Sequence, residues 1–441
     1  MPVRRRARAP PPGRVQSSAP RRRPARARRI VGPAMKISSN ARPPRTALVR
    51  HAMGLIAALV AGLVLAFVRA PGVLVIQPAR ALAASLPMIG LVAAARRLAN
   101  VLRVARARVL LGIFGLVPAA VAQDLSAGFQ RMTVFADGDA QPAPVALFYP
   151  TRAPDRAVAM GPFTARVAMN GPAEPGVKAL IVLSHGTGGS ELGHSGLAAA
   201  LARNGYLVAA LRHGGDNWQD RSLLRRANGG YFVERPRQAS RVIDAVVASA
   251  EWRDRIARDD RGPKVGAIGH SAGGYTVLAL AGGRPDPALV ISHCATSRAE
   301  DPVFCGVAAS AGGDAPAAAT PASAVELRDP RVRAVVALAP VGVVLAAESL
   351  AAIVVPTMVV VAEKDSFLVP RFHGLRLEPL APQLRVERVA GAGHFAFMDR
   401  PGAPVPTEDG DAGADPPGFD RASYLRELQR VVLAFLDDAI R

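Results

Sequence analysis

The sequence has no Asp or Glu before Asp124, although the chain of 441 residues carries 34 acidic and 55 basic side chains and a formal net charge of +21. Residues 1–123 hold 22 of the basic side chains, so the positive excess lies in this N-terminal part. Residues 124–441 hold 33 basic and 34 acidic side chains. A nucleic-acid-binding domain gathers Lys and Arg on a folded face. The balance after residue 123 therefore argues against nucleic acid as a partner of the folded part.

The sequence also has few cysteines, because Cys294 and Cys305 are the only two. They lie in a stretch of loop-like composition, and a single pair in an exported protein is most simply a disulfide. The alternative is two buried free thiols. No second Cys/His pair with ligand spacing accompanies them, so the sequence predicts no metal site.

The N-terminal part predicts export. Residues 1–50 combine Arg runs with Pro and Ala, a composition that cannot bury enough apolar surface to fold. Residues 53–68 carry no charge but are slightly short for a membrane span. Arginines at positions 103, 106 and 108 precede an apolar run at 109–117, and Ala-Val-Ala follows just before Gln123. This order is that of a secretory signal peptide with its cleavage site.

The two apolar segments do not fit one topology. A span at 53–68 would leave the arginines of the following loop outside, against the positive-inside tendency. We therefore expect translation to begin near Met88, with a signal peptide at 88–122 and a periplasmic or secreted product. Residues 1–87 are then a basic segment that is disordered or an over-extended reading of the gene. The alternative, a real span at 53–68, predicts an inner-membrane anchor and a membrane contact.

From Gln123 onward, short apolar runs alternate with amphipathic helices, the pattern of a mostly parallel sheet covered on both faces. We expect one α/β domain over residues 123–441. An antiparallel hairpin is predicted near its start, and a helix is predicted to open at Pro236. Residues 283–330 interrupt the pattern and are expected to form a small lid. The predicted parallel strands lie at 179–183, 206–211, 265–268, 334–338, 357–361 and 384–389.

Ser271 stands at the centre of the pattern Gly269-x-Ser271-x-Gly273, between an apolar strand and an apolar helix. This strand–turn–helix context is that of a nucleophile elbow, where glycines are needed because side chains on the flanking residues would clash. An ordinary glycine-rich turn is the alternative. The context favours Ser271 as a nucleophile.

A serine hydroxyl needs a base that takes its proton and an acid that orients the base. In an elbow arrangement, the order along the chain is serine, acid, histidine. His394 follows the last predicted strand and Asp365 follows the strand before it, so both are expected at the sheet edge that holds Ser271. Glu363 is the second candidate for the acid. For either carboxylate, the alternative role is a surface ion pair.

Backbone amides complete the predicted site. Residues 185–189 read His-Gly-Thr-Gly-Gly directly after a strand, and glycines let such a loop approach a substrate closely. We expect the N–H groups of Thr187 and Ala272 to form an oxyanion hole. Three further residues follow a strand end, where a pocket wall is expected, and are candidates for substrate binding: Asp216, Asn217 and Trp218.

Together these motifs resemble the α/β-hydrolase superfamily. Residues 183–189 and 213–217 are similar to segments of bacterial proteins identified as predicted dienelactone hydrolases, and more distantly of platelet-activating-factor acetylhydrolases. The resemblance covers about residues 127–440 and implies an α/β-hydrolase fold with serine hydrolase activity. A true dienelactone hydrolase has a cysteine nucleophile where this chain has Ser271, so the resemblance implies the superfamily rather than that activity.

The sequence therefore predicts an exported serine hydrolase that cleaves small-molecule carboxylic esters through an acyl-enzyme intermediate, without a metal or an organic cofactor. One alternative keeps the same catalytic residues and acts on phospholipid-type esters. An alternative of another class is a non-catalytic, membrane-anchored binding protein on the same fold. The sequence makes no prediction of oligomeric state.

Overall fold

The computed structural model of the protein describes residues 124–135, 142–225, 230–310 and 325–441. The basic segment 1–87, the apolar run 53–68 and the predicted signal peptide 88–122 lie outside the described residues and stay predictions. Within the described ranges, no helix is long and apolar enough to cross a membrane.

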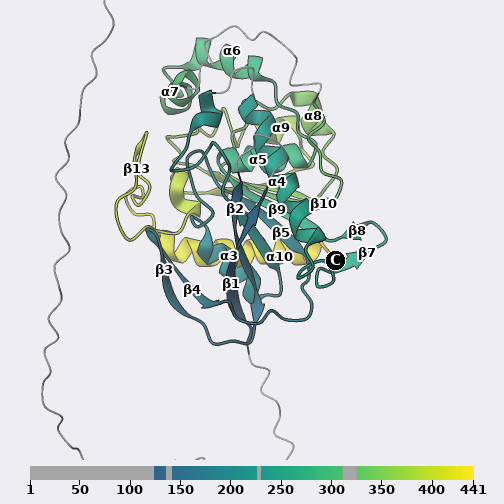
Figure 1. The fold of residues 1–441 in the computed structure, drawn as a ribbon. Coiled ribbons are helices and arrows are strands. Elements are labelled where there is room, and N and C mark those ends of the chain that lie inside the picture. Colours follow the sequence, from purple (N-terminus) through teal and green to yellow (C-terminus); the bar gives the residue numbers. More distant parts are fainter. Residues whose placement is uncertain (1–123, 136–141, 226–229, 311–324) are drawn as a thin grey trace, which may run out of the picture. The chain divides into compact units, whose positions relative to one another are not determined.

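A ten-stranded mixed sheet forms the centre of the described part (Figure 1). The order of its strands is β12-β11-β10-β9-β5-β6-β2-β1-β4-β3. Four further strands of two residues each form two small hairpins, β7 (Arg258–Asp259) with β8 (Gly262–Pro263) and β13 (Pro406–Thr407) with β14 (Gly410–Asp411). The strands of the main sheet are β1 (Ser126–Val134), β2 (Ala143–Thr151), β3 (Arg156–Met160), β4 (Phe163–Met169), β5 (Leu180–Ser184), β6 (Leu207–Leu211), β9 (Val265–His270), β10 (Val332–Leu338), β11 (Thr357–Ala362) and β12 (Arg385–Val389).

The direction of the chain reverses within this sheet. Strands β5, β6 and β9 to β12 pair in parallel, whereas β2 is antiparallel to β6. The predicted hairpin is confirmed, because β1 and β2 pair antiparallel. From β5 the chain crosses to β6 on one side and later returns to β9 on the other. The carboxyl ends of β5 and β9 are therefore neighbours at a topological switch point, where open α/β sheets place their ligands.

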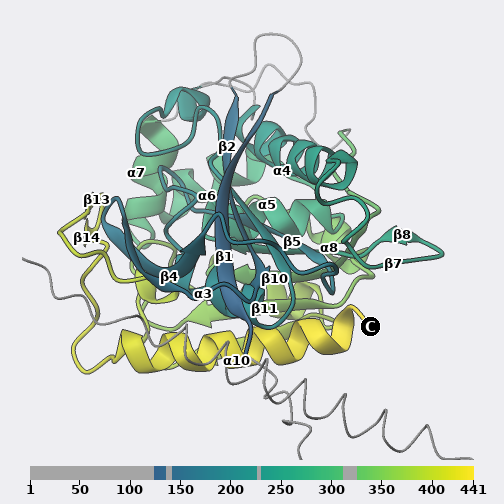
Figure 2. The same cartoon turned by 60° about the horizontal axis from the view of Figure 1, so that its bottom comes forward.

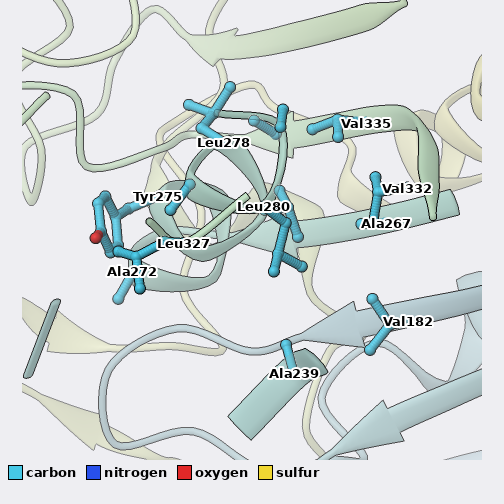
Figure 3. Packing of buried hydrophobic residues seen from close by; sticks show 14 of the residues in the cluster. Val182, Ala239, Ala267, Ala272, Tyr275, Leu278, Leu280, Leu327, Val332 and Val335 are labelled. Atoms are coloured by element: carbon cyan, nitrogen blue, oxygen red, sulfur yellow. The ribbon is translucent and has the colours of Figure 1, made fainter. Parts of the chain in front are cut away.

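Both faces of the sheet are covered, as the continuous apolar strands predict. Along β5, Leu180 and Val182 belong to one buried cluster, and Ile181 and Leu183 belong to the other. Because strand side chains alternate between faces, this division shows that the strand is buried on both sides. Figure 3 shows part of the first cluster, which contains Val182 of β5, Ala267 of β9 and Val335 of β10 together with Leu278 of α5 (Ala272–Leu280).

Helices cover the two faces in separate groups. Helices α4 and α5 contribute to the cluster with Val182, while α3 and α10 contribute to the other cluster. Figure 2 shows α10 along one side of the sheet and α4 with α5 on the opposite side. The helices are α3 (Ser195–Arg203), α4 (Gly230–Ala248), α5 (Ala272–Leu280), α6 (Pro287–Ser297), α7 (Pro302–Ser310), α8 (Ala347–Ala351), α9 (Leu377–Leu380) and α10 (Arg421–Ala439), with 3-10 turns η1 (Ser222–Arg225) and η3 (His394–Phe397).

This topology is that of the α/β-hydrolase fold: a mostly parallel sheet, doubly covered, with one antiparallel strand beside the outermost crossover. The predicted fold class is therefore confirmed. The additional hairpin of β3 and β4 extends the sheet beyond β1.

The predicted start of helix α4 at Pro236 is wrong, because α4 begins at Gly230 and contains the proline. Pro236 has no N–H for the carbonyl four residues earlier, which belongs to Phe232. The hydroxyl of Tyr275 on α5 donates a hydrogen bond of 2.6 Å to this carbonyl. A tertiary contact thus satisfies the acceptor that the proline leaves unpaired, and the helix continues through it.

The lid segment also differs from its predicted loop-like character. Its described part contains two helices, α6 and α7, and prolines stand at the first position of each. Proline is well suited to that position, since its missing N–H would be unpaired there in any case. The side chain of Asp286 caps α6 by accepting from the N–H of Ala288. Cys294 and Cys305 form a disulfide that joins the two helices.

Reduction of this disulfide should loosen the lid and leave the sheet intact. Helices α6 and α7 bury only two residues each in their own spans, and two of these four are the cysteines. Closing a loop of this length is worth roughly 3 kcal/mol in the chain-entropy view. We expect hydrogen–deuterium exchange to rise in residues 287–310 after reduction, with unchanged exchange in β9 and β10. Equal acceleration in those strands would show that the lid and the sheet unfold together.

Candidate active site

Ser271 lies in a strained turn between β9 and α5. Its backbone has φ 58° and ψ −120°, and α5 begins at the next residue, Ala272. A positive φ is unfavourable for residues with a Cβ, and strain of this kind gathers at functional sites. The turn is held from outside: the N–H of Ser271 donates to Leu338 O at 2.9 Å, and its carbonyl accepts from the N–H of Val341 at 3.2 Å.

The flanking glycines are required by close packing. A Cβ built at Gly269 would lie 2.0 Å from Gly273 O, and one at Gly273 would lie 2.0 Å from Ser184 O at the end of β5. Both distances are far below van der Waals contact. The spacing Gly-x-Ser-x-Gly is therefore required, because the two ends of the β9–α5 turn contact each other and the second end contacts β5.

His394 and Asp365 form a buried pair at the same edge of the sheet. Nδ1 of His394 donates to Oδ2 of Asp365 at 2.7 Å. The other carboxylate oxygen of Asp365 accepts from the N–H groups of Phe367 and Leu368 at 2.9 and 2.7 Å. The ring of Phe367 stacks on the imidazole, with centroids 4.8 Å apart. These contacts fix the ring and its tautomer, which leaves Nε2 with a free lone pair.

The second candidate for the acid, Glu363, is exposed to solvent, and within the described ranges the carboxylate that bonds His394 is that of Asp365. His394 also reaches the elbow directly, because its carbonyl accepts from Nε2 of His270 at 2.9 Å and its ring lies 4.8 Å from the His270 ring. Among the described residues, neither Ser271 Oγ nor His394 Nε2 has a hydrogen-bond partner. In unliganded sites, such bonds are often long and tighten only when the substrate binds.

The two predicted oxyanion donors are unpaired in the described part of the chain. No carbonyl or side chain there accepts from the N–H of Thr187 or of Ala272. The loop of Thr187 lies against the serine, since a Cβ built at Gly186 would be 3.0 Å from Ser271 Cβ and 3.5 Å from its Oγ. The end of β5 and the start of α5 therefore place both backbone segments beside the Ser271 side chain.

The three predicted substrate-binding residues have different surroundings. Asp216 is fully buried, and all its hydrogen-bond partners are protein groups. Asn217 is also buried and holds its own turn, donating to His213 O at 2.8 Å and accepting from the N–H of Gln219. Only Trp218 is open to solvent, with 64% of its surface exposed. Of the three, Trp218 alone presents a free side chain to a ligand.

Two side chains of the lid and one from the segment after β11 could hold a metal ion: ligand atoms of His293, Asp301 and His373 lie within 4.8 Å of one another. Their hydrogen bonds favour another role. Oδ2 of Asp301 accepts from Nε2 of both histidines, at 2.8 and 2.9 Å. Nδ1 of His373 accepts from the N–H of Gly342, which puts the ring proton on Nε2, the atom that a metal would need. The cluster thus links the lid to the segment after β11. The prediction of no metal site stays a prediction.

Buried histidines surround the elbow, a feature that sequence reasoning missed. Burial lowers the pKa of His185 to about 4 and that of His194 to about 3, and it lowers the pKa values of His213 and His270 well below the ordinary range. Hydrogen bonds agree with a neutral His185, because its Nε2 accepts from the N–H of His213 at 3.0 Å and its Nδ1 donates to Gly186 O at 2.6 Å. No local pattern distinguishes these rings from exposed histidines.

Alanine at the two helical glycines 273 and 306 should have opposite effects. Gly273→Ala places a methyl group 2.0 Å from Ser184 O and should destabilise the fold by several kcal/mol, since the clash is with backbone. Gly306→Ala in α7 meets nothing within 4 Å and should stabilise by about 0.5–1 kcal/mol through helix propensity. Urea unfolding of both variants checks this pair. Similar stability of Gly273→Ala and wild type would contradict the packing argument.

The protein should lose stability as the pH falls from about 7 to about 4. The four histidines have folded pKa values below the unfolded value of about 6.5, so the unfolded chain binds more protons in this range. Asp399 acts in the opposite sense, since burial raises its pKa to about 6 and the folded state holds the extra proton. Burial also lowers the pKa of His373, so at pH 5.5 we expect a net uptake of several protons on unfolding. Calorimetry in buffers of different ionisation enthalpy measures this uptake.

His194→Leu provides the control for this proton count. Within the described residues, neither ring nitrogen of His194 has a hydrogen-bond partner. An apolar side chain should therefore cost little, and burying an unpaired polar group is itself unfavourable. We expect the uptake at pH 5.5 to fall by about one proton without loss of stability at pH 8. An unchanged uptake would mean that His194 is not the neutral buried group described above.

Comparison with known proteins adds little to this geometry. No protein-family profile matches the chain, and no curated protein matches it. Among solved structures, the chain is similar to one described as a ferulic acid esterase from Streptomyces cinnamoneus, with 18% sequence identity and a TM-score of 0.45 over 74% of this chain and 92% of that chain. A likeness at this level assigns no activity. The resemblance to predicted dienelactone hydrolases and to platelet-activating-factor acetylhydrolases stays a prediction, and function has to come from the site.

Proposed function

We propose that the protein is a serine hydrolase that cleaves carboxylic esters through an acyl-enzyme intermediate. The observation that carries the proposal is the position of Ser271. It occupies a strained turn with φ 58°, at the edge of the sheet that holds the hydrogen-bonded pair of His394 and Asp365. Nucleophile, base and orienting acid come from the ends of β9, β12 and β11, in the chain order that an elbow arrangement requires.

The reaction begins when Ser271 Oγ attacks the ester carbonyl carbon while Nε2 of His394 takes the hydroxyl proton. The imidazolium that forms is stabilised by Asp365, which already accepts from Nδ1. The carbonyl oxygen becomes an oxyanion and accepts from the N–H groups of Thr187 and Ala272. When the tetrahedral intermediate collapses, Nε2 returns the proton to the leaving alkoxide, and the alcohol departs. Water then repeats the sequence on the acyl-enzyme and releases the acid.

We also propose that this enzyme acts outside the cytoplasm. The disulfide between Cys294 and Cys305 supports this location, because such bonds persist in oxidising compartments and are rare in the cytosol. The signal-like segment at 88–122 points to the same periplasmic or secreted location. Both observations fit a protein that is released and one that is anchored to the membrane. The N-terminal residues decide between these two forms.

Turnover of p-nitrophenyl esters should depend on Ser271 and His394. We expect Ser271→Ala and His394→Ala to lower kcat by at least about 10⁴-fold, since members of a triad act as one unit. Asp365→Asn should also lower kcat strongly, because an amide cannot stabilise the imidazolium. Glu363→Gln is the matched control and should keep wild-type kcat, as Glu363 is exposed.

A fluorophosphonate probe separates the proposal from a non-catalytic role on the same fold. The probe should label the wild-type protein at Ser271 and leave Ser271→Ala unlabelled, as shown by mass spectrometry of the labelled peptide. Full ester turnover by Ser271→Ala would exclude the mechanism. Absence of both labelling and turnover in the folded wild-type protein would favour a binding protein.

A further inference from the structure

A buried ion pair lies behind the loop that carries Thr187. The carboxylate of Asp216 binds the guanidinium of Arg235, and both side chains are fully buried. Removing two charges from water costs as much as their attraction returns, so a buried pair of this kind is not explained by stability alone. Its hydrogen bonds indicate what it does.

Asp216 holds the loop from one side. Its Oδ1 accepts from the N–H of Gly188 at 2.9 Å, and its Oδ2 accepts from the hydroxyl of Tyr231 at 2.8 Å. Because a carboxylate only accepts, the tyrosine proton points to Asp216, and the Tyr231 oxygen accepts in turn from Oγ1 of Thr187 at 2.8 Å. Consecutive hydrogen bonds that run from one hydroxyl to the next and end on a carboxylate strengthen one another. Thr187 is thus anchored by its side chain and by the N–H of the next residue.

Arg235 joins the two halves of the predicted oxyanion hole. Its Nη2 donates to His185 O on the loop, and its Nε donates to Oγ1 of Thr276 on α5 at 3.2 Å. Oγ1 of Thr276 donates in turn to Ala272 O at 2.8 Å. One guanidinium therefore contacts the segment before Thr187 directly and the carbonyl of Ala272 through Thr276.

We infer that Asp216, Arg235 and Tyr231 are positioning residues, which hold the N–H groups of Thr187 and Ala272 so that both point to one oxyanion. The inference rests on the proposed function. The loop needs such anchors because it contains three glycines in five residues, with φ +65° at Gly188, and would lose considerable conformational entropy on ordering. A donor that is preorganised stabilises the transition state without reorganising during the reaction.

Tyr231→Phe tests the inference with the smallest change, since it removes one hydroxyl and keeps the ring. We expect kcat for p-nitrophenyl butyrate to fall by about 10- to 100-fold, below the 10²- to 10³-fold typical for the loss of a whole oxyanion donor. The KM should change by less than about threefold, because the interaction is made in the transition state. Inhibition by a trifluoromethyl ketone, whose serine adduct carries an oxyanion, should weaken in proportion to kcat/KM.

Tyr206→Phe is the matched control. The hydroxyl of this buried tyrosine also donates to an aspartate, Asp437, at 2.8 Å, but on the α10 side of the sheet. Its loss should cost similar stability and leave kcat unchanged. A fall in kcat shared equally by both variants would mean that the effect is general loosening of the fold, and the inference would be rejected.

Thr187→Val gives a second measurement that does not depend on Tyr231. It removes the hydroxyl that binds Tyr231 and keeps the backbone N–H, so kcat should fall as in Tyr231→Phe. The double variant should be little worse than either single variant, because both remove the same link. Kinetic effects that multiply would contradict a shared anchor.

The failure of this inference can be told from failure of the proposed function. If Ser271→Ala is inactive and unlabelled while Tyr231→Phe and Thr187→Val keep kcat within about twofold of wild type, only the positioning role is wrong. If Ser271→Ala keeps full turnover, the proposed function fails whatever the other variants do.

Discussion

The close contact between the β9–α5 turn and the end of β5 is the constraint on which the site depends. Gly273 approaches Ser184 O so closely that no side chain fits between them. In parallel register, Ser184 lies beside Gly269, so the residues after each strand leave the sheet at the same level. The loop of Thr187 and the elbow of Ser271 are neighbours for this reason. The helices that follow β5 and β9, α3 and α5, pack on opposite faces of the sheet, which is the arrangement of a topological switch point.

The sequence predicts the parallel strands well because they are buried on both faces, and an apolar run is then a sufficient signal. It fails where a buried strand contains a charge. β10 begins at Val332, two residues before the predicted start, because Arg333 lies within it. The guanidinium of Arg333 binds Asp259 in the β7–β8 hairpin, 74 residues away. The local sequence does not reveal a partner so far away. The arginine therefore marks the boundary of the predicted apolar strand.

The same limit explains the other differences from prediction. Pro236 predicts a helix start because a proline inside a helix leaves the carbonyl four residues earlier without a donor. Here that carbonyl belongs to Phe232, and its donor comes from Tyr275 on another helix. The prolines of the lid indicate loops when the sequence alone is considered, yet Pro287 and Pro302 are the first residues of helices α6 and α7. By contrast, the order of Ser271, Asp365 and His394 is readable because each residue lies within five positions of a strand end. Strand ends fix a side chain near one edge of the sheet without any need for distant partners.

Asp216 and Asp365 show why partner identity decides the role of a carboxylate. Both follow parallel strands and both are buried, but only Asp365 stands between the serine and the histidine along the chain. Asp216 is bound to the guanidinium of Arg235, whose planar fork of donors also reaches Thr276 and the carbonyl of His185, so this pair can hold neighbouring groups in place. Asp365 is bound to the imidazole of His394 through Nδ1, which leaves Nε2 of the ring without a partner among the described residues, as the proposed base requires. The pair with Arg235 therefore suits the proposed oxyanion loop, and the pair with His394 suits proton transfer from Ser271 in the proposed mechanism.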